Sequence, residues 1–477
     1  MAEGEEQARA STPWRDNLEA LAMAVIMALL LKYFVIEAYK IPSGSMQPTL
    51  IGDEKAEVYD RILVDKLSFR FREPKRWEVV VFKYPLDLSK SFVKRLVGIG
   101  PEQIRILYGD LWHRRDGSEP WKILRRSRDV QDETWKRLDL LEPESTRWFP
   151  ESPTLGWEVE GRRVTANGPG RAQFGDRGSI MDGYLDGYPD PLIDLVKKKH
   201  GTGVFPVGDL RVDCEVEAGP DTEFVGITLY EGSRRFVVRL PGPAAPAGAR
   251  PSIEAVGRDF DGNEDRQRVE ADSELRLAAG QRYRFGAQNL DDLVEIDVDG
   301  DVLCGLEVPN SNQGSSLFVF VEGGEAATAT FDDLMAYRDI YYTDIERSEY
   351  TIPEGHFFML GDNTQDSSDS REWKYARLEI EDDSGAPFVI SGNSRRDPDP
   401  WQKNPARLGV GDPDGPRVRF RDKYGETWWL DGPGIPYAAP SSESAPFVPR
   451  RLIQGRALAV FWPLSPRLGL YRWKWIH

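Results

Sequence analysis

The most informative segment of this chain reads Ile41-Pro42-Ser43-Gly44-Ser45-Met46-Gln47-Pro48-Thr49-Leu50. A turn rich in Pro, Gly and Ser directly follows an apolar run, and such a turn can present the Ser45 hydroxyl beside free backbone N–H groups. A serine hydroxyl is a weak nucleophile until a base lies next to it. The segment therefore predicts a nucleophile at Ser45 whose base comes from another part of the chain.

Lys94 is the candidate for that base. The chain has four histidines, and none lies in a segment suited to serve Ser45. Lys94 lies instead in an apolar run from Phe92 to Val97. A lysine acts as a base only as the neutral amine, and burial among apolar side chains lowers its pKa toward that state.

A third segment, from Gly361 to Arg371, is a polar turn that reads Gly-Asp-Asn-Thr-Gln-Asp-Ser-Ser-Asp-Ser-Arg. The three segments, in this order behind an N-terminal apolar segment, resemble the type I signal peptidase family. The resemblance covers about residues 17–125, 347–373 and 447–477. A Ca²⁺ loop is a weaker interpretation of the polar turn, because its spacing misses the EF-hand pattern.

The resemblance implies a role for each polar residue of these segments. It makes Ser45 the nucleophile and Lys94 the general base, with Ser43 helping the Ser45 N–H to stabilise the oxyanion. Three further residues match supporting positions: Ser367 matches a serine that orients the lysine amine, and Asp369 and Arg371 match a structural ion pair.

The same resemblance implies small apolar pockets that admit an Ala-sized side chain of an extended substrate strand. Such pockets discriminate one methylene by only about 1–3 kcal/mol, so the choice of cleavage site should be tolerant. The expected lining residues are Tyr39, Ile41, Pro42, Met46, Leu50, Phe92, Val93 and Met359.

Composition excludes several other classes of protein. A net charge of −17 argues against a nucleic-acid partner, which requires clustered Lys and Arg. Two cysteines, Cys214 and Cys304, exclude a disulfide scaffold and a four-thiolate zinc site. No HExxH motif is present, so we expect no catalytic metal and no cofactor. The cysteines are expected to be free and buried, with a disulfide as the alternative if their domain is extracytoplasmic.

Leu18–Ile36 is predominantly apolar and long enough to cross a bilayer, because these positions make roughly 28 Å of helix. A cleaved secretory signal is the alternative, since the run 21–31 has the length of an h-region. The few basic residues of the tail lean only weakly toward an N-terminus inside. The resemblance implies a single-pass protein of the cytoplasmic membrane with its catalytic domain on the extracytoplasmic side.

The remaining patterns predict a mainly β chain. Short strands are expected at 61–66, 77–84 and 92–98, and a hairpin over 103–124 around Asp116-Gly117. Strict alternation marks Arg211–Glu217, as well as Val294, Ile296 and Val298 before the turn Asp299-Gly300, and it continues through Val302, Cys304, Leu306 and Val308. Such alternation indicates an inserted, jelly-roll-like β-sandwich.

These observations divide the chain into seven parts. They are an N-terminal tail (1–17), a transmembrane helix (18–36), three parts of a catalytic core (37–129, 346–374 and 446–477), the inserted β-sandwich (130–345) and a second insertion (375–445). The C-terminal Tyr471-Arg-Trp-Lys-Trp475 could be a membrane-interface anchor or a strand with one buried aromatic face.

The function implied by the resemblance is that of a membrane-bound serine endopeptidase that removes N-terminal signal peptides from exported preproteins. Its partners would be those signal peptides and the lipid bilayer, together with a ligand or client of the sandwich that the sequence does not identify. The alternative is a catalytically idle membrane-anchored binding protein that acts through the sandwich. Because lengthening a loop costs little free energy, a short linker in place of 130–345 is expected to leave cleavage of small substrates intact.

Overall fold

The structure is a computed structural model of the chain. It describes residues 13–138, 147–151, 156–175, 178–196, 203–258, 262–308, 314–345, 347–381, 387–395, 403–408, 417–430, 443–462 and 471–477. Most of the predicted tail and much of the second insertion lie outside the described residues. The prediction of a mainly β chain with an N-terminal apolar helix is confirmed.

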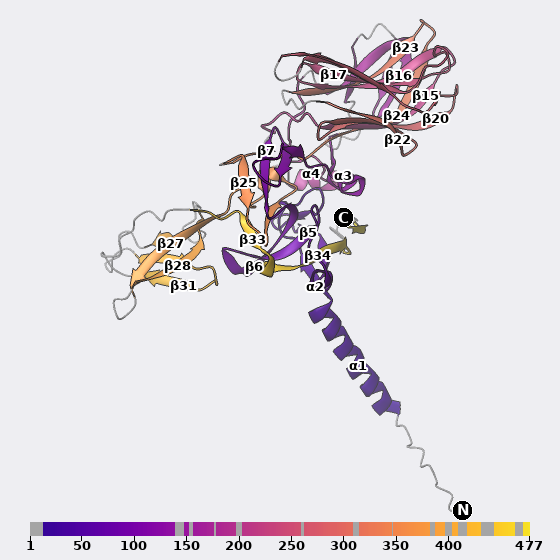
Figure 1. The fold of residues 1–477 in the computed structure, drawn as a ribbon. Helices are drawn as coiled ribbons and strands as arrows, with labels where there is room; N and C mark the ends of the chain where they lie inside the picture. The colour runs from indigo at the N-terminus through magenta and orange to yellow at the C-terminus, as the bar shows by residue number, and fades with distance from the viewer. Residues whose placement is uncertain are drawn as a thin grey trace, which may run out of the picture.

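Helix α1 (Pro13–Phe34) projects from the rest of the molecule as a rod (Figure 1). Its described side chains are exposed. Its segment Asn17–Phe34 has a mean hydropathy of 1.6 and is long enough to cross a membrane. The helix stops two residues earlier than the predicted span, because Ile36 already begins strand β1. The other helices are short: α2 (Ser68–Phe71), α3 (Arg128–Thr134), α4 (Asp190–Val196), η3 (Thr364–Asp366) and η4 (Arg450–Leu452).

An eight-stranded antiparallel sheet forms the centre of the molecule, in the order β1-β4-β34-β5-β6-β26-β33 with β35 beside β34. It joins strands from both ends of the chain, so the N-terminal and C-terminal motifs share one framework. Its strands are β1 (Ile36–Lys40), β4 (Arg61–Asp65), β5 (Val79–Tyr84), β6 (Asp87–Ile99), β26 (His356–Leu360), β33 (Phe447–Pro449), β34 (Ile453–Val460) and β35 (Lys474–Trp475). A small hairpin, β2 (Gly52–Asp53) and β3 (Val58–Tyr59), follows the Ser45 segment.

A four-stranded sheet lies between this framework and the sandwich. It consists of β7 (Glu102–Leu107), β8 (Asp110–Arg114), β9 (Lys122–Ile123) and β25 (Glu349–Ile352). The predicted hairpin around Asp116-Gly117 is present as the connection between the antiparallel strands β8 and β9, but a further hairpin precedes it, because β7 and β8 also pair through a turn at Tyr108-Gly109, where both residues have positive φ. A two-residue turn with positive φ at both positions matches the twist of the flanking strands. Asp-Gly is a typical sequence for such a turn and Tyr-Gly is not, so the turn at Tyr108-Gly109 could not be predicted from its residues.

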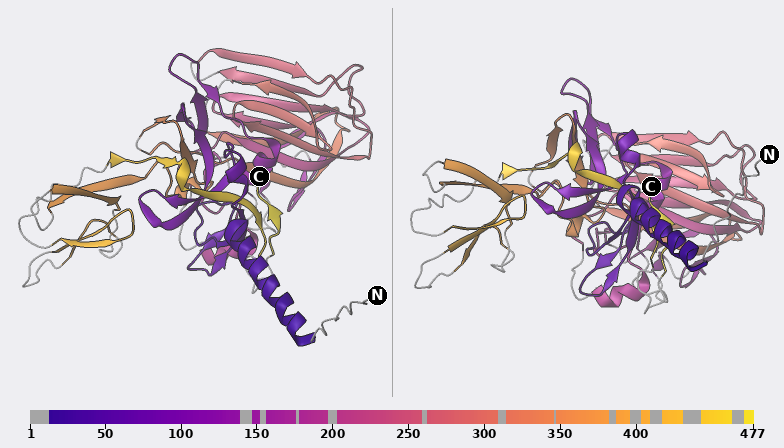
Figure 2. Two further views of the ribbon diagram at one scale, coloured as in Figure 1. Left: turned by 60° about the horizontal axis from the view of Figure 1, so that its bottom comes forward. Right: turned by 90° about the horizontal axis from the view of Figure 1, so that it is seen from below.

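Two larger sheets pack face to face as a β-sandwich, visible at the top of Figure 1 and from two further directions in Figure 2. One sheet has the order β12-β13-β24-β15-β20-β21-β22 with β10 beside β24, and the other has the order β11-β14-β23-β16-β17-β18-β19. The first contains β10 (Lys136–Arg137), β12 (Glu158–Glu160), β13 (Arg163–Asn167), β15 (Leu210–Ala218), β20 (Arg282–Leu290), β21 (Leu293–Val298), β22 (Asp301–Glu307) and β24 (Thr328–Arg338). The second contains β11 (Trp148–Pro150), β14 (Gly170–Phe174), β16 (Thr222–Glu231), β17 (Arg234–Pro241), β18 (Ser252–Arg258), β19 (Glu264–Glu270) and β23 (Ser315–Gly323).

The alternation predicted for the sandwich holds on β15 and β21 but fails at Val302. A register shift opposite Ile296 and Asp297 turns this side chain outward, and it is 49% exposed. A β-bulge of this kind changes which face the following residues occupy. The turn at Asp299-Gly300 is confirmed, with positive φ at both residues.

The two cysteines are free, with Cys214 buried and Cys304 partly buried. Cys214 lies on β15 and Cys304 on β22, with β20 and β21 between them. Three steps across a sheet amount to roughly 14 Å, whereas a disulfide needs Cα atoms within about 7 Å. The alternative of a Cys214–Cys304 disulfide is therefore wrong.

Two three-stranded sheets lie between Glu372 and Phe447 and form a separate lobe with its own small core (Figure 1). They consist of β27 (Lys374–Glu381), β28 (Pro387–Asn393), β29 (Ala406–Leu408), β30 (Arg417–Arg421), β31 (Thr427–Leu430) and β32 (Glu443–Ser444). This lobe touches the central sheet where Leu88 N donates to Lys423 O at 2.7 Å.

The sandwich packs against the catalytic core and is not joined to it by flexible linkers alone. Val130, Ile340 and Tyr342, from the two edges of the predicted insertion, pack in one hydrophobic cluster with Trp77 and Val97. The chain therefore enters and leaves the sandwich through a shared core.

Candidate active site

The Ser45 turn is held against the central sheet by backbone hydrogen bonds. Ile41 N donates to Asp60 O at 3.0 Å, and Asn363 N donates to Ser45 O at 3.1 Å. Gly52 lies so close that a Cβ on it would come within 2.2 Å of Ile41 O, so only glycine fits there. The turn and the third sequence segment thus meet at the Ser45 backbone.

Lys94 reaches Ser45 from the neighbouring strand β6. Its Nζ donates to Ser45 Oγ at 2.7 Å, and Lys94 and Ser45 are only 4% and 8% exposed. Burial lowers the pKa of Lys94 to about 8, although Asp369 and Asp362 oppose this shift. A buried amine that readily loses its proton beside a hydroxyl is suited to general-base catalysis.

Ser43 lies on the exposed side of the same turn. Its Oγ donates to Ser45 Oγ at 3.4 Å. The hydroxyl is therefore close enough to reach an oxygen that develops next to Ser45, as an oxyanion donor must.

Ser367 is buried at the site but does not make the expected contact. Its Oγ makes no hydrogen bond to any residue that the structure describes. The hydroxyl packs against Gly361, where a Cβ would lie 2.1 Å from Ser367 Oγ and 2.5 Å from Ser45 O. Ser367 is thus in the first layer of side chains around Ser45, with its orientation toward Lys94 still a prediction.

Asp369 and Arg371 form a fully buried pair. Arg371 Nε and Nη2 donate to the two carboxylate oxygens of Asp369 at 2.9 and 2.7 Å, and Gly361 N donates to Oδ2 at 3.1 Å. Burial alone would raise the pKa of Asp369, but Arg371, Lys94 and the Gly361 N–H together hold it below its usual range. The pair fixes the backbone that carries Ser367.

A second buried ion pair was not expected from the sequence. Arg95 donates through Nε and Nη2 to both carboxylate oxygens of Asp362, each at 2.8 Å, and through Nη2 to Thr49 Oγ1 at 3.0 Å. This bidentate pair ties the Ser45 turn to the third segment. A charged residue next to Lys94 inside an apolar strand was the signal that could have identified it. Because Asp362 and Asp369 are each engaged by a guanidinium, neither carboxylate is arranged to hold a metal.

The expected pocket residues divide into two groups. Tyr39, Phe92 and Val93 are partly exposed and Pro42 is exposed, so a substrate can touch them. The other four, Ile41, Met46, Leu50 and Met359, are no more than 4% exposed. Leu50 and Met359 have no exposed surface and support the pocket from beneath rather than lining it.

Two tyrosines from the predicted insertion lie directly against the Ser45 turn, and no sequence motif marks them. A Cβ on Gly44 would meet Tyr184 Oη at 2.9 Å and Tyr188 Oη at 3.1 Å. Tyr184 Oη donates to Asp366 Oδ2 at 3.2 Å, and Tyr188 Oη donates to Tyr184 Oη at the same distance. The segment around α4 therefore forms one wall of the site, against the expectation that the insertion stands apart from it.

A buried lysine amine that hydrogen-bonds a serine hydroxyl on a β framework is the arrangement of a Ser/Lys hydrolase. The sequence profile described as "Signal peptidase, peptidase S26" matches residues 14–120 and 310–382. A signal peptidase I of Pseudomonas aeruginosa is 36% identical over 223 residues, covering 43% of this chain and 75% of that protein. The chain therefore belongs to the type I signal peptidase family.

Other relatives match a shorter part. A probable signal peptidase I-2 of Synechocystis is 36% identical over 105 residues, or 21% of this chain and 45% of that protein. A signal peptidase I of Leptolyngbya laminosa is 34% identical over 111 residues, or 22% of this chain and 51% of that protein. The chain thus spans about half the length of these two relatives. Among solved structures, a carbohydrate-binding module of Bacillus subtilis covers 41% of this chain with 10% identity and a TM-score of 0.25, too low to assign a function.

Proposed function

We propose that this protein is a membrane-anchored signal peptidase I, a serine endopeptidase that cleaves signal peptides from preproteins. The observation that carries the proposal is the 2.7 Å hydrogen bond from Lys94 Nζ to Ser45 Oγ, in surroundings that lower the pKa of the amine to about 8. A catalytically idle scaffold would have no need to keep a lysine buried and poised in this way.

In this proposal Lys94, as the neutral amine, takes the proton of the Ser45 hydroxyl while the oxygen attacks the scissile carbonyl. The Ser45 N–H and the Ser43 hydroxyl stabilise the oxyanion. Lys94 then gives the proton to the leaving amine, and an acyl-enzyme ester remains on Ser45. A water molecule, deprotonated by Lys94, hydrolyses the ester and releases the signal peptide's new carboxylate.

The remaining site residues act on this pair as positioning residues. Ser367 orients the Lys94 amine by turning its unpaired hydroxyl toward it, and the Asp369–Arg371 pair holds the segment that carries Ser367. The substrate binds as an extended strand, because main-chain pairing is independent of sequence and alternate side chains enter pockets. Tyr39, Phe92 and Val93 meet those side chains, and the buried apolar residues behind them set the pocket depth.

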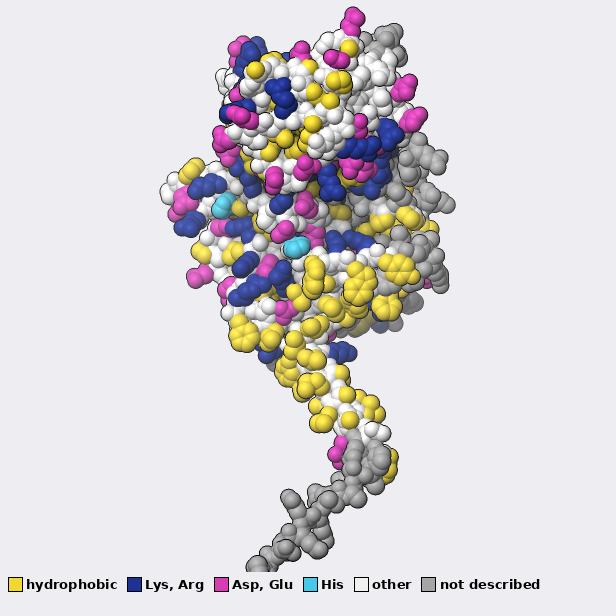
Figure 3. Space-filling model, turned by 90° about the vertical axis from the view of Figure 1, so that its right-hand side faces the viewer, with side chains coloured by type: hydrophobic (Ala, Val, Ile, Leu, Met, Phe, Trp, Pro, Cys, Tyr) yellow, Lys and Arg dark blue, Asp and Glu magenta, His cyan; other side chains and the backbone are white. Residues whose placement is uncertain are grey.

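Helix α1 anchors the protein in the cytoplasmic membrane, with the catalytic part on the extracytoplasmic side. Large aromatic side chains gather on the surface next to the base of this helix, where Figure 3 shows a hydrophobic patch. They are Phe71, Trp462, Tyr471, Trp473 and Trp475, exposed by 43–81%. Aromatic side chains favour the membrane–water interface, which supports the anchor interpretation of the C-terminal segment over a buried aromatic face.

Cleavage of a synthetic preprotein by the detergent-solubilised full-length chain tests this proposal. Ser45→Ala and Lys94→Ala should each abolish turnover, and the double variant should be scarcely worse, because the two residues act as one unit. Lys83→Ala, on the neighbouring strand β5, is the matched control and should retain activity. Wild-type activity should rise with pH and reach half its plateau near pH 8, where the Lys94 amine loses its proton. Substantial turnover by Lys94→Ala would exclude the dyad.

A further inference from the structure

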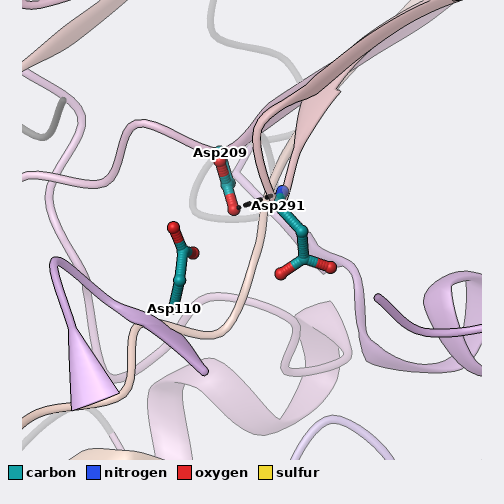
Figure 4. Close-up of side chains that lie close together, drawn as sticks. All are labelled: Asp110, Asp209 and Asp291. Carbon is teal, nitrogen blue, oxygen red and sulfur yellow. Dashed lines mark hydrogen bonds between the residues drawn. The ribbon is translucent and has the colours of Figure 1, made fainter. Parts of the chain in front are cut away.

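Three aspartates from distant parts of the sequence converge where the four-stranded sheet meets the sandwich. Asp110 begins β8, Asp209 immediately precedes β15, and Asp291 lies in the turn between β20 and β21 (Figure 4). One carboxylate oxygen from each lies within 4.8 Å of the others. Oxygens that share one Ca²⁺ ion at 2.3–2.6 Å can be up to about 5 Å apart, so this spacing is compatible with a common ligand.

The backbone holds this arrangement in place. Asp291 and Asp292 both have positive φ, which places the turn in a conformation that most residues avoid. Asp291 N donates to Asp209 Oδ2 at 3.1 Å, and Asp339 N donates to Asp209 O at 3.0 Å. Asp110 and Asp291 are only 7% and 4% exposed. The carboxylates are therefore built into the junction rather than spread over a solvated surface.

Two buried acceptor atoms at this place have no donor among the residues that the structure describes. One is Asp291 Oδ2, and the other is Oδ1 of Asn289, a residue that is 1% exposed. Asn289 lies close to the cluster, because it pairs across β15 and β20 with Leu210, the neighbour of Asp209, and its Nδ2 donates to Gly208 O and Glu231 Oε2, both at 3.4 Å. The Asn289 amide oxygen is a buried acceptor that does not belong to the three carboxylates. A hydrogen-bond donor or a cation would satisfy it.

A cavity of about 10 Å³ lies beside the cluster, and Asp110, Asp209, Gly208 and Glu231 are among its lining residues. That is close to the space of one water-sized sphere, which also suffices for one metal ion. Its lining is rich in acceptor oxygens, and hard divalent cations prefer oxygen ligands.

The neighbouring arginines offset the negative charge of the cluster only in part, because Arg126 and Arg125 oppose the rise in the pKa of Asp291 without cancelling it. Arg126 Nη2 is 3.7 Å from Asp291 Oδ1 but hydrogen-bonds Asp339, and Arg234 pairs with Glu231 at 2.9 Å. Each guanidinium thus already faces a further carboxylate outside the three aspartates. Burial and mutual repulsion raise the pKa values of Asp110 and Asp209 well above the usual range, and burial raises that of Asp291 to about 6.

We propose that Asp110, Asp209 and Asp291, with the Asn289 amide oxygen, bind one Ca²⁺ ion that fastens the sandwich to the four-stranded sheet. The ion removes the repulsion between the carboxylates and gives both orphaned acceptors a partner. The sequence predicted no metal for this chain, because its ligands are single aspartates about 100 and 80 residues apart rather than a contiguous loop. The role is structural and independent of the peptidase chemistry.

Tyrosine-sensitised Tb³⁺ luminescence on the EDTA-treated full-length chain in detergent tests the site, because Tyr108 and Tyr341 line the same cavity. We expect one Tb³⁺ site that Ca²⁺ displaces, and a melting temperature that rises by several degrees with Ca²⁺ and falls again with EDTA. Asp110→Asn should abolish both responses. Asp301→Asn, an exposed change on β22, is the matched control and should preserve them.

If Asp110→Asn does not fold, Asn289→Leu is the second variant, because it keeps all three carboxylates. It should weaken Ca²⁺ binding at least tenfold. Two results would overturn the proposal. One is no effect of millimolar Ca²⁺ on Tb³⁺ signal or melting temperature. The other is a metal-free protein that becomes more stable as pH falls from 7 to 5, with no metal response, since protons would then be what the carboxylates share.

Discussion

Replacing Lys94 with methionine should abolish peptidase activity and at the same time stabilise the fold at neutral pH. Lys94 is 4% exposed, and burial lowers its pKa from 10.5 to about 8. Below pH 8 the folded protein must therefore keep a buried ammonium that the unfolded chain would hydrate. The fold loses stability as pH falls from 10.5 toward 8, and the loss then levels off.

The size of the effect follows from that pKa difference. At pH 7 it corresponds to about 3 kcal/mol of folding free energy, since each pKa unit is worth about 1.4 kcal/mol. Methionine has a similar volume and no charge, but it cannot donate to Ser45 Oγ, and one lost hydrogen bond costs about 1 kcal/mol. Lys94→Met should therefore be about 2 kcal/mol more stable than wild type at pH 7. This advantage should shrink by about 2–3 kcal/mol between pH 7 and pH 10.

Urea unfolding of the detergent-solubilised full-length chain at both pH values measures the difference. Lys94→Arg is the control, because its guanidinium stays charged throughout and should destabilise the fold at either pH. An advantage of Lys94→Met that does not change with pH would refute the assignment of a depressed pKa to this amine. The dyad would then lack its base at neutral pH.

Three other changes test how the site is held. Gly44→Ala should lower turnover at least tenfold, because its Cβ would crowd the Tyr184 and Tyr188 hydroxyls at 2.9 and 3.1 Å; a second change, Tyr184→Phe, should restore part of the activity. Asp362→Asn should destabilise the protein by about 3–5 kcal/mol in urea unfolding, because it leaves the buried Arg95 charge unpaired. A Gly/Ser linker in place of 130–345 should abolish cleavage of even a short peptide in a variant shown to be folded by circular dichroism; retained cleavage would mean that the site needs no residue of the insertion.

The sequence was informative where chemistry is local. The Ser45 turn, the apolar strand around Lys94 and the Gly361–Arg371 turn each carry their signal in a few consecutive residues, and the structure places them side by side. The register of paired strands and the burial of single side chains are harder to predict, because both depend on residues far away in the sequence. Val302 lies outside the core because of a bulge opposite Asp297. Leu50 is buried because other elements cover it, and nothing in its own neighbours indicates that.

The insertion shows the same limit most clearly. Loop-closure entropy predicts only that a long insertion is tolerated, and it is silent on whether the inserted residues touch the site. Glu133 lies 3.4 Å from Arg95, and Tyr184 reaches both Gly44 and Asp366. These contacts come from two separate places in the insertion and meet the Ser45 turn and its clamp from different sides. The sandwich is therefore attached through residues that also shape the site, and the insertion contributes to the surroundings of Ser45 rather than only occupying a loop.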